Sequence, residues 1–294
     1  MMSQPKRRGV SDNHKEWLMV ANWKMNLPQS SLDIFAMIKD YVEKTLDHIS
    51  YSHHQARGRH DATHDHDSKS LAAREVKVVI CPPYPFLAAM NAALCAVGEE
   101  KRLYLGAQNL HSQSYGSFTG EVSAGMLADV GVRYVIVGHA ERRRQFGESP
   151  SDIQAKLAQA LAVNMRPILC LGESADQRKG HSLGAFLGSL LRQCLDAIEP
   201  THRLLIAYEP LWAIHSSQPA TVEQIEEVLG CLRDALVSHW GLSFGKKVSF
   251  LYGGSVDARY AEMLRHMDGL SGALVGRASL SVNTWGQLLA AVMI

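Results

Sequence analysis

The sequence of 294 residues lacks an excess of charge of either sign, because 30 Lys and Arg residues are balanced by 29 Asp and Glu residues, which gives a net charge of +1. Proteins that bind nucleic acids or anionic membranes through charge carry a marked basic excess, so this balance argues against both partners. The sequence also lacks any apolar run near the roughly 20 residues that span a bilayer. Hydrophobic residues make up 46% of the chain, which is enough to bury a large core.

Cysteine is scarce, and its pattern is equally restrictive. The five cysteines are odd in number and scattered without a CxxC pair, so no disulfide is predicted. We also expect no metal site and no cofactor. Their apolar surroundings predict buried free thiols and a cytoplasmic protein. They are Cys81, Cys95, Cys170, Cys194 and Cys231. Residues 1–15 are basic but lack the apolar segment of a signal peptide, and we interpret them as a flexible extension.

Short apolar runs alternate with helical periodicity along the rest of the chain. The eight runs are residues 17–23, 76–81, 103–107, 133–137, 167–171, 204–208, 248–252 and 272–275. Between them, apolar residues recur at three- and four-residue steps, which is typical of helices that bury one face. Thr221 with Gln224, and Ser151 with Gln154, have the spacing of capping boxes before two of these helices.

Near-continuous apolar strands that alternate with helices predict a parallel sheet covered on both faces. Eight units in about 250 residues suit a closed barrel better than an open doubly wound sheet. We therefore predict an α/β protein with a single (β/α)8 TIM barrel over residues 16–294. In this fold the chemistry lies at the C-terminal ends of the strands.

One segment interrupts the alternation. Residues 48–69 contain six histidines among Asp, Ser, Arg and Gly, with almost no apolar side chains. Such a segment cannot bury a core, so we predict a disordered surface loop on the barrel face opposite the chemistry. Metal binding is the alternative, although the spacing matches no defined site.

Polar residues stand where several predicted strands end. Asn22 and Lys24 follow the first strand, where an inward-facing lysine can anchor an anionic substrate. His139 follows the fourth strand at the start of a helix, and a helix N-terminus favours the neutral imidazole that can donate to a carbonyl. Glu209 ends the sixth strand, where Pro210 prevents regular structure from continuing. A carboxylate at such a point is paired, solvated or used for chemistry.

Glycine-rich turns follow the seventh and eighth strands. They place Ser255 and Gly276 before helical segments. Backbone N–H groups in such turns bind phosphate, and this is the usual phosphate position of the barrel. Each feature alone is more often structural than functional, but their order along eight β/α units favours one shared site.

Seven short motifs resemble those of the triosephosphate isomerase family, from about residue 17 to the C-terminus. The motifs are NWKMN (22–26), GAQN (106–109), GEVSAGML (120–127), GHAERR (138–143), ILCLGE (168–173), YEPLWAI (208–214) and YGGSV (252–256). This resemblance implies an isomerase of glycolysis and gluconeogenesis that interconverts dihydroxyacetone phosphate and glyceraldehyde 3-phosphate through an enediolate. The family is itself the standard illustration of a glutamate base paired with a neutral histidine.

The resemblance also implies roles for five catalytic residues. Glu209 corresponds to the base that moves a proton between adjacent carbons, and His139 to the electrophile that polarises the carbonyl. Lys24 and Asn22 correspond to residues that hold the substrate and stabilise the enediolate. Glu141 corresponds to the glutamate that pairs with the lysine.

Three further segments take their expected roles from the same resemblance. Residues 210–220 correspond to a lid that closes over the phosphate and excludes water. Ser255 and the backbone around Gly276 correspond to phosphate-binding groups. Residues 108–120 correspond to a loop that enters the neighbouring subunit, with Thr119 reaching toward the partner's active site, so a homodimer is expected.

Four positions depart from the family pattern. His-Ser-Ser (215–217) stands at the lid tip in place of Gly-Thr-Gly, and Pro219 occupies the second hinge of the lid. Ala140 replaces a serine whose hydroxyl can hold the glutamate at rest, and Arg277 replaces a glycine beside the phosphate. We expect His215 and Arg277 to contact the substrate and to adopt glycine-like backbone angles only at a cost.

These departures leave two alternatives open. The first is a paralogous isomerase that acts on a four-carbon tetrulose (erythrulose) phosphate. The second is a catalytically weak barrel kept for binding. The joint presence of Lys24, His139 and Glu209 argues against the second.

Overall fold

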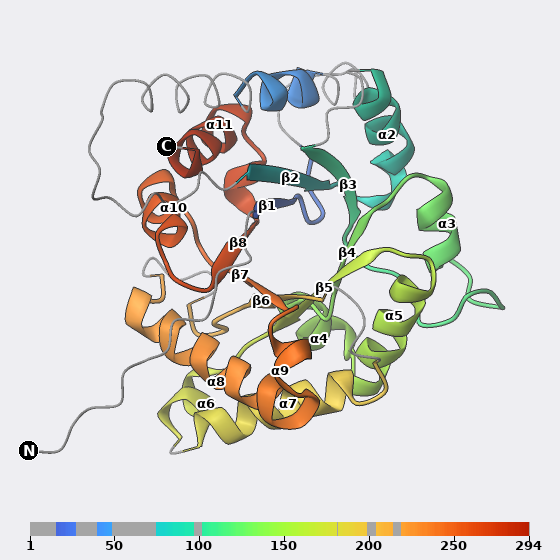
Figure 1. Ribbon diagram of the computed structural model, residues 1–294. Coiled ribbons are helices and arrows are strands. Elements are labelled where there is room, and N and C mark those ends of the chain that lie inside the picture. The colour runs from blue at the N-terminus through green and yellow to red at the C-terminus, as the bar shows by residue number, and fades with distance from the viewer. Residues whose placement is uncertain are drawn as a thin grey trace, which may run out of the picture.

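The computed structural model describes residues 16–27, 40–48, 75–96, 102–180, 182–198, 204–213 and 219–293. Its centre is a closed barrel of parallel strands that pair in chain order from β1 to β8, with β8 against β1 (Figure 1). The strands are β1 (Glu16–Asn22), β2 (Glu75–Cys81), β3 (Leu103–Ala107), β4 (Tyr134–Val137), β5 (Arg166–Leu171), β6 (Leu205–Tyr208), β7 (Ser249–Tyr252) and β8 (Leu270–Val275). The predicted single (β/α)8 barrel is confirmed.

Helices surround the barrel as an outer ring (Figure 1). They are η1 (Tyr84–Phe86), α2 (Leu87–Ala96), α3 (Ala124–Asp129), α4 (Ala140–Phe146), α5 (Pro150–Ala162), α6 (Ala175–Lys179), α7 (Leu183–Leu195), α8 (Val222–Trp240), α9 (Leu242–Gly245), α10 (Ala258–Arg265), η2 (Arg277–Ser279) and α11 (Val282–Val292). Residues 40–48, between β1 and β2, are helical as well.

Both faces of the strands are buried, which explains their near-continuous apolar sequences. Val20 of β1 points into the barrel and packs with Ile136 and Ile168, whereas its neighbour Met19 points outward into the layer beneath the helices. The outer layer is the larger of the two cores, so the helices are held mainly by apolar packing against the strands.

The two predicted capping boxes had different outcomes. Thr221 caps α8, and its side chain and that of Gln224 exchange hydrogen bonds with each other's backbone N–H groups. The box expected at Ser151 was wrong, because α5 is capped two residues earlier by Ser149 with Asp152. Pro150 stands at the first helical position, where its missing N–H costs nothing.

The cysteine prediction was partly correct. All five cysteines are free, and Cys81, Cys170 and Cys194 are buried. Cys95, near the end of α2, is exposed, whereas Cys231 of α8 is half-buried and faces Gly184 of α7. Burial raises the pKa of the Cys170 thiol, and the nearby Glu209 carboxylate raises it further.

Several expectations concern residues outside the described ranges. They include the extension 1–15, the lid tip 215–217 and the histidine-rich segment apart from His48. Within the described ranges, no group of three or more His, Cys, Asp or Glu side chains is placed to hold a metal ion. None of the helices described combines the length and the apolar character needed to traverse a bilayer.

The amino-terminal end of the barrel is closed by paired charges and tyrosines. Lys77 donates to Glu16 Oε1 at 2.5 Å and lies over the ring of Tyr104. Arg166 donates to the hydroxyl of Tyr134 at 3.0 Å and stacks on its ring. Glu16 is the shared counter-charge of Lys77 and Arg166 at this end.

Candidate active site

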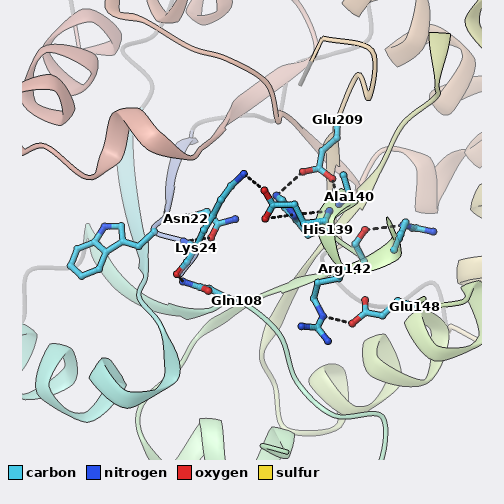
Figure 2. A network of polar contacts seen from close by, with 12 residues as sticks. Asn22, Lys24, Gln108, His139, Ala140, Arg142, Glu148 and Glu209 are labelled. Atoms are coloured by element: carbon cyan, nitrogen blue, oxygen red, sulfur yellow. Dashed lines mark hydrogen bonds and ion pairs between the residues drawn. The ribbon is translucent and has the colours of Figure 1, made fainter. Parts of the chain in front are cut away.

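A cavity of about 680 Å³ opens at the carboxyl ends of the strands. It is lined by every predicted site residue that lies within the described ranges. These are Asn22, Lys24, His139, Glu141, Glu209, Ser255, Gly276 and Arg277. Figure 2 shows Asn22 and Lys24 on one side and His139 and Glu209 on the other. The remaining predicted site residue, His215, lies outside the described residues.

The Glu209 carboxylate directly follows β6 and is buried, with 2% of the residue exposed. Its Oε1 lies 3.1 Å from His139 Nε2, and its Oε2 accepts a hydrogen bond from the Ala140 N–H at 2.9 Å. Gly253 leaves room for this side chain, because a Cβ at that position would lie 2.9 Å from Glu209 Cγ. The carboxylate is therefore held against the imidazole from two sides.

His139 caps the N-terminus of α4. Its Nδ1 accepts a hydrogen bond from the Glu141 N–H at 3.3 Å. A nitrogen that accepts this bond carries no proton, so we assign the neutral tautomer with hydrogen on Nε2. His139 Nε2 lies 3.1 Å from Glu209 Oε1, and its hydrogen is available to an oxygen atom of a bound molecule.

Lys24 stands immediately after β1 in a left-handed backbone conformation, with φ of 53°. Its N–H donates to Asn22 Oδ1 at 3.0 Å, and its carbonyl accepts from Gln108 Nε2 at 2.9 Å. Its ammonium group lies 2.5 Å from Glu141 Oε1. Non-glycine residues rarely adopt this conformation, and it persists only where the surroundings hold it.

The glycine-rich turns after β7 and β8 form the floor of the cavity beside the lysine. Gly254 and Ser255 line it from one turn and Gly276 from the other. A Cβ at residue 276 would lie 3.3 Å from Lys24 Cε, so the glycine lets the lysine side chain approach the backbone closely. An anion placed here would meet the ammonium group and backbone together.

The structure corrects one expectation about the departures and adds a contact to another. Arg277 begins the short helix η2, and its φ is not positive. It therefore does not carry the glycine-like backbone strain expected of it. Ala140 lacks a hydroxyl, yet its backbone N–H still holds Glu209. The backbone therefore supplies one resting contact for the carboxylate that does not depend on the side chain at residue 140.

Sequence reasoning missed a second buried carboxylate, Glu173, which follows β5. Its Oε1 accepts hydrogen bonds from Tyr208 at 2.9 Å, from the indole of Trp212 at 2.8 Å and from Arg178 at 3.0 Å. Burial and the Glu173 charge raise the pKa of Tyr208, which keeps its hydroxyl protonated as a donor. Glu173 closes the ILCLGE motif, but nothing in that motif indicates its three partners.

The contacts of Glu173 fix the first turn of the segment 210–220. At the other end of this segment, Ala220 donates to the hydroxyl of Tyr252 at 3.3 Å, and its carbonyl accepts from Tyr260. Both ends of the expected lid are thus anchored by buried polar side chains.

The fold and the site together define a (β/α)8 barrel in which a carboxylate, a neutral imidazole and an ammonium group surround one cavity. The sequence profile described as triosephosphate isomerase matches residues 49–292. The chain is 34% identical over 266 residues to the triosephosphate isomerase of Alkaliphilus oremlandii, covering 90% of this chain and 94% of that protein. It is 36% identical over 277 residues to that of Rhodopirellula baltica, covering 93% and 96%.

A solved structure agrees with these relatives. The crystal structure of triosephosphate isomerase from Bartonella henselae superposes with a TM-score of 0.73 at 28% identity, over 94% of this chain and 98% of that one. The chain belongs to the triosephosphate isomerase family of aldose–ketose isomerases. The resemblance seen in the seven sequence motifs is confirmed.

Proposed function

We propose that this enzyme interconverts dihydroxyacetone phosphate and glyceraldehyde 3-phosphate, with Glu209 and His139 as the proton-transfer pair. The observation that carries the proposal is the joint position of Glu209, His139 and Lys24 around one cavity at the carboxyl ends of the strands. Family membership supports the three-carbon substrate.

In the proposed reaction the Glu209 carboxylate removes a proton from C1 of dihydroxyacetone phosphate. The electron pair of that C–H bond forms the C1–C2 double bond of an enediolate, and the carbonyl π electrons move to its oxygen. His139 donates from Nε2 to this oxygen and then accepts the proton of the neighbouring hydroxyl. Glu209 returns its proton to C2, which completes the aldehyde.

Lys24 and Asn22 stabilise the charge in this scheme. The Lys24 ammonium faces the developing negative charge on the enediolate oxygen and the phosphate, and Glu141 holds the ammonium in place. Charge stabilisation by a fixed group contributes most in a site that excludes water. Ser255, the backbone at Gly276 and the exposed Arg277 would bind the phosphate, with His215 approaching from the lid.

In the proposed function, residues 210–220 form the lid that excludes water from the site. The anchors at Trp212 and Ala220 support this role, since they fix both ends of the segment to the barrel, as the hinges of a lid require. Water exclusion protects the enediolate from losing phosphate.

We also propose a homodimer formed through residues 108–120. Tyr115 of this loop is 87% exposed and Phe118 is 43% exposed, although both are large apolar residues. Met25, beside Lys24, is 95% exposed. Exposed large apolar side chains on one loop suit a protein interface, in which Thr119 would reach the partner's site. Free buried thiols and the glycolytic family support a cytoplasmic location.

A side-by-side kinetic comparison on triose and tetrulose phosphates tests the proposed activity. We expect kcat/KM to be higher for the triose phosphates. A higher value for tetrulose phosphate would favour the paralogous tetrulose phosphate isomerase instead. No turnover of either substrate would favour the barrel kept for binding.

A further inference from the structure

The backbone of Lys24 is unusual among the described residues. Only Lys24 and Asn164 combine a side chain with a positive φ there. Asn164 follows α5 in a turn, and asparagine tolerates this conformation through its short polar side chain. Lysine has no such tolerance, so other groups must hold residue 24.

Two side chains hold the Lys24 peptide groups. Asn22 accepts from the Lys24 N–H, whereas Gln108 donates from Nε2 to the Lys24 carbonyl and to the Cys81 carbonyl, each at 2.9 Å. An amide nitrogen carries two hydrogens, so both donors of Gln108 are used. Because Gln108 follows β3, Cys81 ends β2 and Lys24 follows β1, this amide joins the ends of three adjacent strands. Figure 2 shows Gln108 reaching toward Lys24.

We propose that Gln108 is a positioning residue that holds the Lys24 backbone in its left-handed conformation and thereby fixes the ammonium group. This inference rests on the proposed role of Lys24. The ammonium is 2.5 Å from Glu141, and the lysine side chain fits closely against Gly276. A rotation of the residue 24 backbone would move the ammonium out of both contacts.

The position of Gln108 has a second consequence. It is the first residue of the loop 108–120, so the same side chain that holds Lys24 also fixes where this loop leaves the barrel. Gln108 thus links the base of this loop directly to the Lys24 backbone.

A double-mutant cycle tests the proposal. Gln108→Met and Lys24→Met are made singly and together, and the affinity for 2-phosphoglycolate, a phosphorylated acid, is measured by titration calorimetry. A misplaced group can cost as much as about 100-fold, so we expect Gln108→Met to weaken binding about tenfold when Lys24 is present. In the Lys24→Met background the same change should weaken binding less than about twofold, because the two residues act as one unit.

Gln193→Met is the matched control. Gln193 is an exposed glutamine of α7 whose side chain donates a hydrogen bond to Ser189 of the same helix. It should bind like the wild type. Equal weakening by Gln108→Met in both backgrounds would show that Gln108 only supports the fold, and no weakening in either would also overturn the proposal. A wild type that lacks isomerase activity would refute the proposed function instead, whatever the cycle gives.

Discussion

The two ends of the barrel use charged residues in opposite ways. At the amino-terminal end, Lys77 and Glu16 pair directly, and their charges are satisfied inside the protein. At the carboxyl end, Lys24, Glu141 and Glu209 line a cavity of about 680 Å³. Both ends contain partly buried charges, so buried charge alone does not distinguish a catalytic end from a structural one.

Backbone conformation separates the two ends more clearly. Lys24 has a positive φ, whereas Glu16, Lys77 and Arg166 at the amino-terminal end do not. Strain of this kind costs about 1–3 kcal/mol and persists where the surrounding structure enforces it. The carboxyl end therefore combines charge, an open cavity and strain, and this combination indicates the site.

The largest expected effect comes from Glu209, the proposed base at the carboxyl end. Glu209→Gln should lower kcat by about 10²- to 10⁴-fold, because a positioned general base contributes that much. The amide oxygen can still accept from the Ala140 N–H, so the fold should persist. Steady-state kinetics, with thermal unfolding as the control for folding, measure this. Turnover like that of the wild type would remove Glu209 from the mechanism.

A smaller effect is expected at the proposed phosphate site, which also lies at the carboxyl end. Arg277→Gly and His215→Gly, alone and together, should change the preference for triose over tetrulose phosphate. The difference in activation free energy between the two substrates should change by about 1–3 kcal/mol at most. Since Arg277 has no positive φ, Arg277→Ala should behave like Arg277→Gly. The kinetic constants for both substrates test this. If Arg277→Ala matches the wild type while Arg277→Gly does not, backbone strain matters after all.

At the amino-terminal end we expect a change in stability without a change in kcat. Lys77→Met should cost about 1 kcal/mol by removing the hydrogen bond to Glu16. Burial lowers the pKa of Lys77, but the hydrogen bond and charge of Glu16 outweigh it, so the pKa is raised above 10.5.

The direction of that shift fixes the pH dependence. The contribution of Lys77 is complete below the unfolded pKa and is lost as the pH rises through the folded pKa. The stability difference between wild type and Lys77→Met should therefore shrink in strongly alkaline solution. Urea unfolding at neutral and alkaline pH measures it, and a difference that grows with pH would contradict this account.

The smallest effect is expected from the histidine-rich segment. Replacing residues 49–69 with a short polar linker should leave kcat/KM unchanged, because the loop is predicted to lie away from the chemistry. His48 should be kept, since its ring packs against Gly286 of α11. Loss of activity that zinc restores would revive the metal-binding alternative.

The sequence predicted the strands well because each is buried on both faces and bounded by polar residues. All eight were placed within two residues of their observed ends. The predicted eighth strand began at Gly272, two residues after the observed start of β8, because a glycine is typical of a strand boundary. In the barrel this glycine has a φ of 152°, and a Cβ there would lie 1.9 Å from the Leu18 carbonyl oxygen. Close packing against β1, which is adjacent in the barrel but distant in sequence, thus requires a glycine, a residue that local patterns assign to turns.

The site residues at strand ends were predictable for the same reason, since the barrel brings those ends together. The supporting residues were not. Gln108 lies 84 residues from Lys24, and Glu173 lies 39 residues from Trp212. Their hydrogen bonds depend on which strand ends become neighbours and on side-chain direction, and neither is recorded in a local pattern.

Deuterium incorporation from solvent tests the central claim most directly. Dihydroxyacetone phosphate is incubated with the enzyme in heavy water, and the glyceraldehyde 3-phosphate formed is examined by proton NMR. If Glu209 carries the proton through an enediolate, the wild type should place deuterium at C2. The Glu209→Gln variant should form labelled product at least about 100-fold more slowly. Equal labelling rates for wild type and variant would contradict the account.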